Sequence, residues 1–464
     1  MKSMKSGERM SENTIAAIAT ANGIGGIGVI RVSGGQARSI CDKIFVSVSN
    51  KKLTEMKGYT ATYGHVYEKE ELLDDAVALV FTAPNSYTGE DVVEISCHGG
   101  MYITKRVLRA ILKSGAVAAQ AGEFTKRAFL NGKMGLTEAE AVMDIIGAKG
   151  EQSVRAARAC MDGTLRKRID AVKDTLVNST AHLAAWADYP EEDIPQIQAD
   201  TLKQNLQSAE NEIATLLSQY DTGKIMKQGV DTVIAGRPNV GKSTLMNLLS
   251  GCERSIVTEI PGTTRDIIEE TVMLGEIPLN LSDTAGLRST ADPIEKIGVE
   301  KAKQRILNAG LVLAVFDASR ALSDEDNELL DLLTTAPAVA VINKTDLEQN
   351  LDIDYIRSKI SHVVLISALN GDGAEALEKA VADIVGTARL DASQGILANE
   401  RQRDAAERAK KYISEAIEAL NSGITLDAVT IILEDAVQAL LELTGESVND
   451  TIVDTVFSHF CVGK

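Results

Sequence analysis

The chain has 464 residues, of which 44% are hydrophobic and 25% charged, and its formal net charge is −18 at pH 7. At roughly 150 residues per domain, this length predicts about three packed domains. The acidic balance argues against a protein that holds nucleic acid mainly through phosphate contacts, so we expect any RNA partner to be bound by a local patch or through a second protein.

The apolar stretches of the chain are short. Because no clean run of 18 apolar residues is present, we expect no membrane span. Lys2, Lys5 and Arg9 precede an apolar run, but Asn22 and glycines at 23, 25, 26 and 28 interrupt it. This segment therefore predicts a strand, a glycine-rich turn and a second strand instead of a signal peptide. The lack of an Arg-rich transit peptide favours a bacterial cytoplasmic protein.

The cysteines and histidines show no metal or disulfide pattern. Cysteines stand at positions 41, 97, 160, 252 and 461, an odd number with no two close in sequence. This spacing argues against a disulfide framework and against C-x-x-C motifs. The five histidines lack any ligand spacing, so we expect no structural zinc site.

Hydrophobic periodicity divides the chain into four segments. Residues 14 to 120 alternate β-rich runs with turn signals around one helical run, VLRAILKSG, which is typical of an α+β domain. From about 136 to 227 the pattern predicts successive amphipathic helices, from Asp231 it becomes βαβ, and from 389 it is helical again. We therefore predict domains at 1–133, 134–227, 228–388 and 389–464, with the βαβ domain inserted into an all-helical one.

The segment GRPNVGKST carries a phosphate-binding signature. It contains Gly236-x-x-x-x-Gly241-Lys242-Ser243 between the strand candidate DTVIA and the helix candidate TLMNLLS. In that context backbone N–H groups and the helix N-terminus cradle phosphates, Lys242 reaches the β- and γ-phosphate oxygens, and Ser243 ligates Mg²⁺. The alternative, a chance glycine-rich turn, has a prior of roughly 5%.

Three further motifs indicate that the bound base is guanine. DTAG at 283–286 ends a strand candidate and supplies Asp283 for magnesium and the Gly286 N–H for the γ-phosphate. NKTD at 343–346 supplies Asp346, whose carboxylate can accept hydrogen bonds from guanine N1–H and the exocyclic amine. SAL at 367–369 follows a third strand and can contact the base from its other side. Their order and spacing predict a GTP-binding domain.

The loop TEIPGTTRD, residues 258–266, occupies the place of a switch I segment, and Thr264 is the candidate second magnesium hydroxyl. Leu287 follows DTAG where Ras-like enzymes place a water-orienting Gln. Asn239 lies inside the P-loop, where its side-chain oxygen can face a cation that neutralises transition-state charge. From these residues alone, a cation ligand and an ordinary loop residue with slow hydrolysis are equally good interpretations of Asn239.

The motifs along the chain resemble the MnmE family, also called TrmE, of tRNA modification GTPases. The resemblance rests on TIAAIAT, GGIGVIRVSG, APNSYTGEDVVEI, GEFTKRAFLNGK, DYPEEDI, GRPNVGKST, GTTRD, DTAGLR and the terminal FCVGK, in that order. It implies a multidomain α/β architecture: an α+β tetrahydrofolate-binding-like N-terminal domain, an all-α helical domain and a Ras-like P-loop G domain inserted into the helical domain.

The resemblance also implies an activity. Members of this family are potassium-activated GTPases that dimerise through the N-terminal domain and work with MnmG, an FAD- and NADH-using partner, in a heterotetramer. Together they add an aminomethyl or carboxymethylaminomethyl group at C5 of the wobble uridine of certain tRNAs. The one-carbon unit comes from 5,10-methylenetetrahydrofolate, of which 5-formyltetrahydrofolate is an analogue. The tRNA is expected to be held largely through the partner.

Matching motif positions carry the roles of the G-domain residues over from the family. The resemblance implies that Asn239, Thr258, Ile260 and Thr263 hold potassium, and that Ser243 and Thr264 hold magnesium. Glu295 would orient the attacking water through a relay, with Lys242 and Arg288 as the other catalytic candidates. The expected GTP-binding residues are Asn239, Val240, Gly241, Lys242, Ser243, Thr244, Thr258, Glu259, Ile260, Pro261, Gly262, Thr263, Thr264, Asp283, Thr284, Ala285, Gly286, Asn343, Lys344, Thr345, Asp346, Ser367 and Ala368.

The resemblance places a folate pocket in the N-terminal domain, with Arg31, Glu94, Lys133 and Lys464 as its residues. A carboxylate such as Glu94 can pair with the amino and N–H groups of the pterin, while cations suit the carboxylates of the glutamate tail. For each of them the alternative is an ordinary surface ion pair. The sequence departs from the family at Asn22-Gly23-Ile24, at Gln120-Ala121 and at Gly135, which bears on the pocket and not on the G domain.

Cys461 stands four residues from the chain end. CVGK is a poor prenylation signal because Gly463 is not aliphatic and Lys464 is not a usual last residue. The resemblance brings the chain end back to the folate pocket, so we expect Cys461 to support that site. Two other functions remain as alternatives: a regulatory or ribosome-assembly GTPase, which would need a basic RNA-binding module, and a membrane-attached scaffold that uses Cys461 as its anchor.

Overall fold

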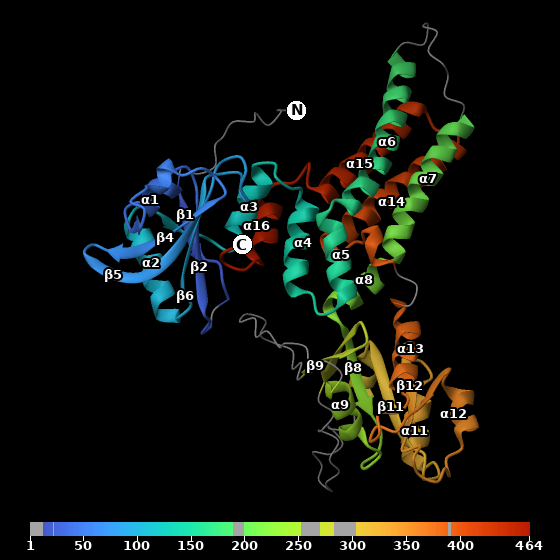
Figure 1. Cartoon of the computed structure of the whole chain (residues 1–464). Helices are drawn as coiled ribbons and strands as arrows, with labels where there is room; N and C mark the ends of the chain where they lie inside the picture. The colour runs from blue at the N-terminus through green and yellow to red at the C-terminus, as the bar shows by residue number, and fades with distance from the viewer. Residues whose placement is uncertain (1–12, 22, 189–198, 252–269, 283–302, 388–390) are drawn as a thin grey trace. The chain divides into compact units, whose positions relative to one another are not determined.

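The computed structural model describes residues 13–21, 23–188, 199–251, 270–282, 303–387 and 391–464. The chain divides into two compact units, one of residues 1–143 with 444–464 and one of residues 144–443. The predicted α+β, helical and βαβ segments all appear in this order along the chain (Figure 1), so the predicted fold class is confirmed.

The N-terminal unit is built on a seven-stranded sheet of order β3-β4-β5-β6-β2-β1-β7. Its strands are β1 (Ile15–Ile18), β2 (Ile27–Ser33), β3 (Phe45–Ser47), β4 (Thr60–Glu68), β5 (Glu71–Phe81), β6 (Val92–His98) and β7 (Val117–Ala118). Its helices are α1 (Ala37–Cys41), α2 (Met101–Lys113), α3 (Glu123–Leu130) and α16 (Asp450–Ser458), and α4 (Leu136–Gly147) leads out of it.

Strand alternation decides which side chains of this sheet are available to a site. Ile30 and Val32 of β2 and Ile95 of β6 are buried in one core with α1 and α2. Because successive side chains of a strand point to opposite faces, Arg31 and Glu94 lie on the other face, and they are direct partners in the β2–β6 register. The fold therefore presents an opposite-charge pair on the sheet face that does not bear the α1–α2 core.

The chain end packs back onto this unit. Val462 forms a bridge with Ala121, and the N–H of Gly122 donates to the carbonyl of Cys461 at 3.4 Å. Phe457 and Phe460 have ring centroids 5.1 Å apart and bury against Leu136 at the start of α4. These contacts of residues 457–462 with the N-terminal unit bring Lys464 close to Arg31.

The second unit combines helices with the inserted βαβ domain. Its helices outside the βαβ domain are α5 (Glu151–Met161), α6 (Thr164–Asp188), α7 (Ala199–Ser218), α8 (Tyr220–Gln228), α14 (Glu400–Asn421) and α15 (Leu426–Thr444). Helix α14 packs along α7, which brings residues 400–421 beside residues 199–218. No helix in the described ranges is long and apolar enough to cross a membrane.

The βαβ domain, called the G domain below, has a six-stranded sheet of order β13-β12-β11-β8-β10-β9. Its elements are β8 (Val230–Ala235), α9 (Lys242–Gly251), β9 (Glu270–Leu274), β10 (Ile277–Ser282), β11 (Leu311–Asp317), α11 (Asp324–Leu333), β12 (Ala338–Asn343), α12 (Ile353–Lys359), β13 (His362–Leu365) and α13 (Ala374–Val385). The four predicted parallel strands are β8, β11, β12 and β13, and β10 also runs parallel to β8. Strand β9, which pairs antiparallel with β10, was not predicted.

Candidate functional site

The phosphate-binding loop joins β8 to α9 and depends on its glycines. Gly236 has φ +143° and Gly241 has φ +99°, both in the region that L side chains rarely adopt. A Cβ at Gly236 would lie 2.4 Å from the Val315 carbonyl oxygen, and one at Gly241 would lie 2.2 Å from Asn343 Nδ2. The close approach of neighbouring strands therefore requires glycine at both positions.

Lys242 is folded back over this loop. Its Nζ donates to the carbonyl oxygens of Gly236 and Arg237, each at 2.7 Å. Burial lowers the pKa of Lys242, because a half-buried ammonium loses hydration. The two carbonyls hold the ammonium group over the loop, at the point where the motif requires a cation for the phosphates.

The base-recognition motifs meet the phosphate-binding loop through Asn343. Its Nδ2 donates to the Val240 carbonyl at 2.9 Å, and its Oδ1 accepts from the Ala368 N–H at 3.0 Å. Ser367 Oγ donates to Asp346 Oδ1 at 2.6 Å, which orients the carboxylate. The structure thus brings together residues of GRPNVGKST, NKTD and SAL that are far apart in the sequence.

Asp317, at the end of β11, belongs to this site although the sequence analysis did not single it out. Lys344 Nζ donates to Asp317 Oδ2 at 2.6 Å and to the Asn239 carbonyl at 2.8 Å. Burial alone would raise the pKa of Asp317, but hydrogen bonds from Lys344 and Ser319 offset it and hold this pKa below its usual range. An Asp that ends a fully buried strand, as in LVLAVFD, was the available signal.

Much of the predicted switch machinery falls in the parts of the chain that the structure does not describe. The potassium and magnesium candidates at 258–264, the DTAG residues 283–286, and Arg288 and Glu295 all lie there. Ser243 and Asn239 are described, and both are exposed. Asn239 adopts φ +67°, a conformation that Asn tolerates better than most residues.

An ion pair anchors the phosphate-binding loop from outside. Arg237 Nε lies 2.9 Å from Oδ2 of Asp326, whose side chain is 2% exposed. The same oxygen accepts from the Ser323 N–H at 2.9 Å, and Ser323 Oγ accepts from the Asp326 N–H at 3.3 Å; these two bonds are the capping box of α11. The Arg237 carbonyl also accepts a hydrogen bond from Lys242 Nζ. The Arg237–Asp326 ion pair therefore helps to fix the carbonyl that positions the lysine ammonium.

Replacing Arg237 by Gln is expected to raise the KM for GTP about tenfold with little change in kcat, because the loop loses its anchor and Asp326 loses its cationic partner. The free energy of unfolding should fall by roughly 1–3 kcal/mol. Steady-state kinetics and urea unfolding measure the two effects. The neutral pair Arg237→Gln/Asp326→Asn should recover part of the KM loss, and a tenfold loss in kcat alone would contradict this role.

In the N-terminal unit, three of the four predicted folate residues are close together. Arg31 Nε lies 2.8 Å from Glu94 Oε1, and Arg31 Nη1 donates to the Gly463 carbonyl at 3.3 Å. Burial lowers the pKa of Lys464, Arg31 lowers it further and Glu94 opposes the change. Lys133 instead donates to the Pro84 carbonyl at 3.1 Å, in the same loop as Tyr87.

Two aromatic residues complete this cluster and were not predicted as site residues. The Arg31 guanidinium carbon lies 5.6 Å from the ring centroid of Tyr87 and 5.7 Å from that of Phe124. Lys464 Nζ lies 6.0 Å from the Tyr87 ring centroid. Burial raises the pKa of Tyr87. Phe124 is fully buried, so the cluster offers two cations, one carboxylate and the aromatic ring of Tyr87, which suits a flat, polar ring with an anionic tail.

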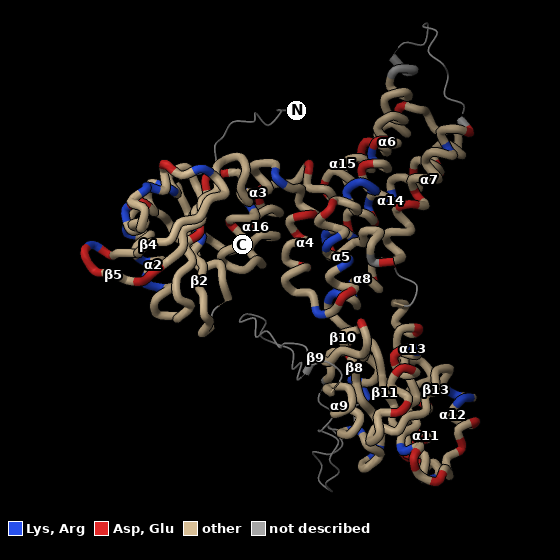
Figure 2. The backbone as a smooth tube through the Cα atoms, in the orientation of Figure 1, with Lys and Arg blue, Asp and Glu red and all other residues tan. Residues whose placement is uncertain are grey.

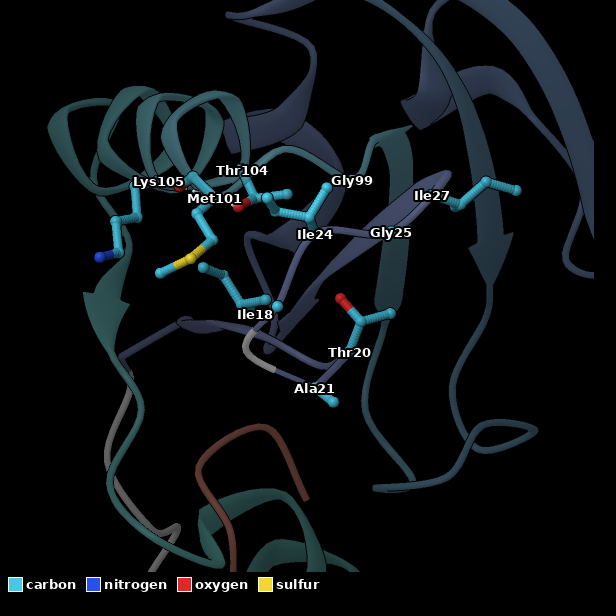
Figure 3. Close-up of a pocket in the computed structure, with 11 residues that line it drawn as sticks. Ile18, Thr20, Ala21, Ile24, Gly25, Ile27, Gly99, Met101, Thr104 and Lys105 are labelled. Carbon is cyan, nitrogen blue, oxygen red and sulfur yellow. Dashed lines mark hydrogen bonds between the residues drawn. The ribbon is translucent and has the colours of Figure 1, made fainter. Parts of the chain in front are cut away.

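The three departures noted in the sequence lie at different places. Gly23 and Ile24 line a cavity of about 280 Å³ beside the N-terminal end of α2, together with Thr20, Met101 and Lys105 (Figure 3). Asn22 lies outside the described residues. Ala121 is the bridge partner of Val462, and the carbonyl of Gly135 accepts from the Ala139 N–H at the start of α4. Cys461 is exposed and its sulfur forms no disulfide.

Comparisons with known proteins identify the family. Residues 14–133 match the family model described as GTP-binding protein TrmE N-terminus, and residues 136–461 match the MnmE helical domain. The chain is 43% identical over 458 residues to the tRNA modification GTPase MnmE of Alkaliphilus metalliredigens, covering 98% of this chain and 99% of that protein.

Two further relatives carry the same name. The identity is 44% over 459 residues with the protein of Symbiobacterium thermophilum, covering 98% of this chain and all of that protein. It is 42% over 457 residues with that of Clostridioides difficile, covering 98% and 99%. The chain, which joins this N-terminal unit to a helical unit with an inserted GTP-binding fold, belongs to the MnmE family of tRNA modification GTPases.

Proposed function

We propose that this protein is a potassium-activated GTPase that acts in tRNA modification with the FAD-dependent partner MnmG. The pair adds an aminomethyl or carboxymethylaminomethyl group at C5 of the wobble uridine of certain tRNAs, with 5,10-methylenetetrahydrofolate as one-carbon donor. The observation that carries the GTPase assignment is the Asn343 linkage, which joins the loop at Val240 to Ala368. This linkage supports one site that binds the phosphates and the guanine together.

The residues of the described G domain fit the roles that GTP hydrolysis requires. Lys242 is held at the loop by two carbonyls and can exchange them for phosphate oxygens. Asp346, oriented by Ser367, accepts the guanine N–H groups. The Ser243 hydroxyl at the start of α9 is the hard oxygen ligand that suits Mg²⁺. A bound magnesium ion supplies charge neutralisation at the β- and γ-phosphates.

Asn239 supports the potassium assignment. Lys344 fixes its backbone carbonyl and its conformation has φ +67°, so the position of residue 239 in the loop is set by the rest of the site. Its exposed side chain carries an amide carbonyl oxygen, which is a suitable ligand for a monovalent cation. Potassium bound there would offset phosphate charge in the place of an arginine finger.

The Arg31–Glu94–Lys464 cluster supports the folate assignment. Glu94 can accept hydrogen bonds from the pterin, while Arg31 and Lys464 can pair with the carboxylates of the glutamate tail. Tyr87 provides aromatic surface beside Arg31, and the ring of the fully buried Phe124 packs near the same guanidinium group. Cys461 is exposed two residues before Gly463, whose carbonyl Arg31 contacts, and we assign it a supporting role.

The surface charge supports a tRNA held mainly through the partner. Figure 2 shows basic and acidic residues interspersed along α5 and α14. Ion pairs within these helices, such as Arg158 with Asp162 at 3.2 Å and Arg403 with Glu407 at 3.5 Å, reduce the positive charge available to phosphates. The proposal also includes a homodimer in complex with MnmG, working in the bacterial cytoplasm, as the family resemblance implies.

The experiment that tests the proposal compares GTP turnover in potassium and sodium buffers of equal ionic strength. We expect potassium to raise kcat by tenfold or more, and Asn239→Gly to remove most of the stimulation. Glycine accepts a positive φ without strain, so this variant removes the side chain and keeps the backbone. Equal rates in the two buffers would contradict the potassium role and favour a regulatory GTPase that needs an outside activator.

A further inference from the structure

The β9–β10 hairpin, residues 270–282, contacts α5, α8 and the α4–α5 loop of the helical domain. It lies between the two predicted switch segments, since switch I is expected at 258–266 and DTAG at 283–286. Strand β10 pairs with β8 up to Ser282, one residue before Asp283. Its six residues span roughly 20 Å, so the strand connects the predicted magnesium site with the far end of the hairpin.

At that far end, the hairpin caps a helix of the helical domain. Helix α5 begins after Gly150, which has no side chain and provides no cap hydrogen bond. Glu276, in the hairpin turn, accepts the Gln152 N–H through Oε2 at 3.1 Å. A carboxylate at a helix N-terminus satisfies a free N–H group and interacts favourably with the helix dipole. The cap that α5 lacks locally is therefore supplied by the G domain.

The hairpin can approach the start of α5 closely because residue 150 is glycine. A Cβ there would lie 2.9 Å from Met273 Cε and 3.4 Å from the Glu276 carbonyl oxygen. Helix α5 is held on its other side by Ser153, whose Oγ donates to the Met226 carbonyl of α8 at 2.5 Å. The first turn of α5 is thus attached both to the hairpin and to the helix that leads into the G domain.

A second set of contacts joins the hairpin to the entry of the G domain. Asn280 is buried, and its Nδ2 donates to the Gln228 carbonyl at the end of α8 at 2.9 Å. Its Oδ1 accepts from Thr271 Oγ1 at 3.1 Å and from Lys149 Nζ at 3.5 Å. Lys149 also reaches Thr271 Oγ1 at 3.4 Å, and burial lowers its pKa. Asn280 therefore connects α8, the α4–α5 loop and both hairpin strands.

We propose that the β9–β10 hairpin transmits the nucleotide state of the G domain to helix α5, with Glu276 as a cap that engages or releases and Asn280 as the pivot. The inference rests on the proposed GTPase function and adds the route by which the helical domain detects it. A displacement of β10 that accompanies nucleotide exchange moves Glu276 relative to Gln152, and loss of that hydrogen bond frays the first turn of α5. Coupling of this kind is reciprocal, so uncapping α5 also changes the relative affinities for GDP and GTP.

Hydrogen exchange of the full-length protein in potassium buffer tests this inference. We compare exchange of amides 150–156 with saturating GDP and with a non-hydrolysable GTP analogue. In the unmodified protein we expect at least a threefold difference in exchange rate between the two nucleotides. In Glu276→Gln we expect these amides to exchange faster, and we expect the difference in exchange rate between the two nucleotides to fall below 1.5-fold. The ratio of the affinities for GDP and the GTP analogue should also change. Basal GTP turnover should stay within twofold of the unmodified protein.

Two further variants separate transmission from simple helix stability. Glu276→Gln/Gly150→Ser supplies a local cap through the introduced hydroxyl, and only the flexible end of Met273 must move to admit the added Cβ. We expect this double variant to recover slow exchange without recovering the nucleotide dependence. Glu328→Gln, at an exposed site on α11, is the matched control and should behave as the unmodified protein.

The outcomes distinguish failure of the inference from failure of the function. If both nucleotides bind but exchange at the start of α5 is the same with each, or if Glu276→Gln keeps the difference, the hairpin does not transmit the nucleotide state. If neither nucleotide binds and GTP is not hydrolysed, the proposed function is wrong and the inference is overturned with it.

Discussion

Asp346→Asn is expected to lower the affinity for GTP by about 100-fold or more and to make xanthosine triphosphate the preferred nucleotide. The Asp346 carboxylate, which accepts from Ser367 Oγ at 2.6 Å, is oriented to accept from the N1–H and amino groups of guanine. An Asn side chain offers one acceptor and one donor, and its donor opposes the guanine amino group. Xanthine has an oxygen in place of that amino group, so the Asn donor finds a partner.

The size of the effect follows from the number of hydrogen bonds changed. Each hydrogen bond to a charged group contributes roughly 1.5–3 kcal/mol, and a factor of ten in affinity corresponds to about 1.4 kcal/mol. Sites built to hydrogen-bond a polar group discriminate against an analogue that lacks the matching group by roughly 10⁴-fold. Competition binding of GTP and xanthosine triphosphate measures the change in preference.

A control keeps the test specific to the base. Asp354→Asn removes an exposed carboxylate of the same domain, which pairs with Arg357 at 3.3 Å, and should leave both affinities unchanged. If Asp346→Asn bound the two nucleotides in the same ratio as the unmodified protein, Asp346 would not contact the base, and the assignment of NKTD would be wrong.

Glu94→Gln is expected to weaken binding of 5-formyltetrahydrofolate by roughly 10- to 100-fold while GTP turnover stays unchanged. The Glu94 carboxylate faces the same sheet surface as Arg31 and is the anionic acceptor in the described cluster with Lys464. An amide replaces one acceptor oxygen by a donor, which opposes the donor groups of the pterin. Loss of one or two charge-assisted hydrogen bonds accounts for this range of affinity.

Isothermal titration of the full-length protein with 5-formyltetrahydrofolate measures this effect. Glu71→Gln is the matched control because it breaks an ion pair with Arg106 in the same unit, 2.9 Å long, away from Arg31. An unchanged dissociation constant in Glu94→Gln would show that the Arg31–Glu94 pair is structural and that folate binds elsewhere. The cavity beside α2, lined by Thr20 and Lys105, would then be the first alternative to test.

The nucleotide site could be predicted from the sequence because its chemistry resides in short motifs. GRPNVGKST and NKTD each combine residues within a few positions of one another, and each follows a buried strand whose hydrophobic pattern is visible locally. Parallel strands present their carboxyl ends at one edge of a sheet, so these motifs had to meet once the βαβ pattern was identified. The contacts of Asn343 with Val240 and Ala368 are the result of that geometry.

Other features depended on contacts between segments that are distant in the sequence. The partners Lys344 of Asp317, Asp326 of Arg237, and Tyr87 and Phe124 of Arg31 were not predicted, because each pair joins residues that are distant in the sequence. Strand β9 was missed because no motif follows it and its antiparallel pairing with β10 is visible only in the structure.

The sequence by itself determined the order of the domains, the P-loop and the preference for guanine, because periodicity and local spacing encode them. The family resemblance implied that the chain end returns to the folate pocket, but only the tertiary structure decided that it contacts Arg31 through the Gly463 carbonyl, and that Glu276 of the hairpin caps α5 at Gln152. Such contacts pair residues more than a hundred positions apart. Their partners are selected by how whole elements pack, which no local pattern of residues specifies.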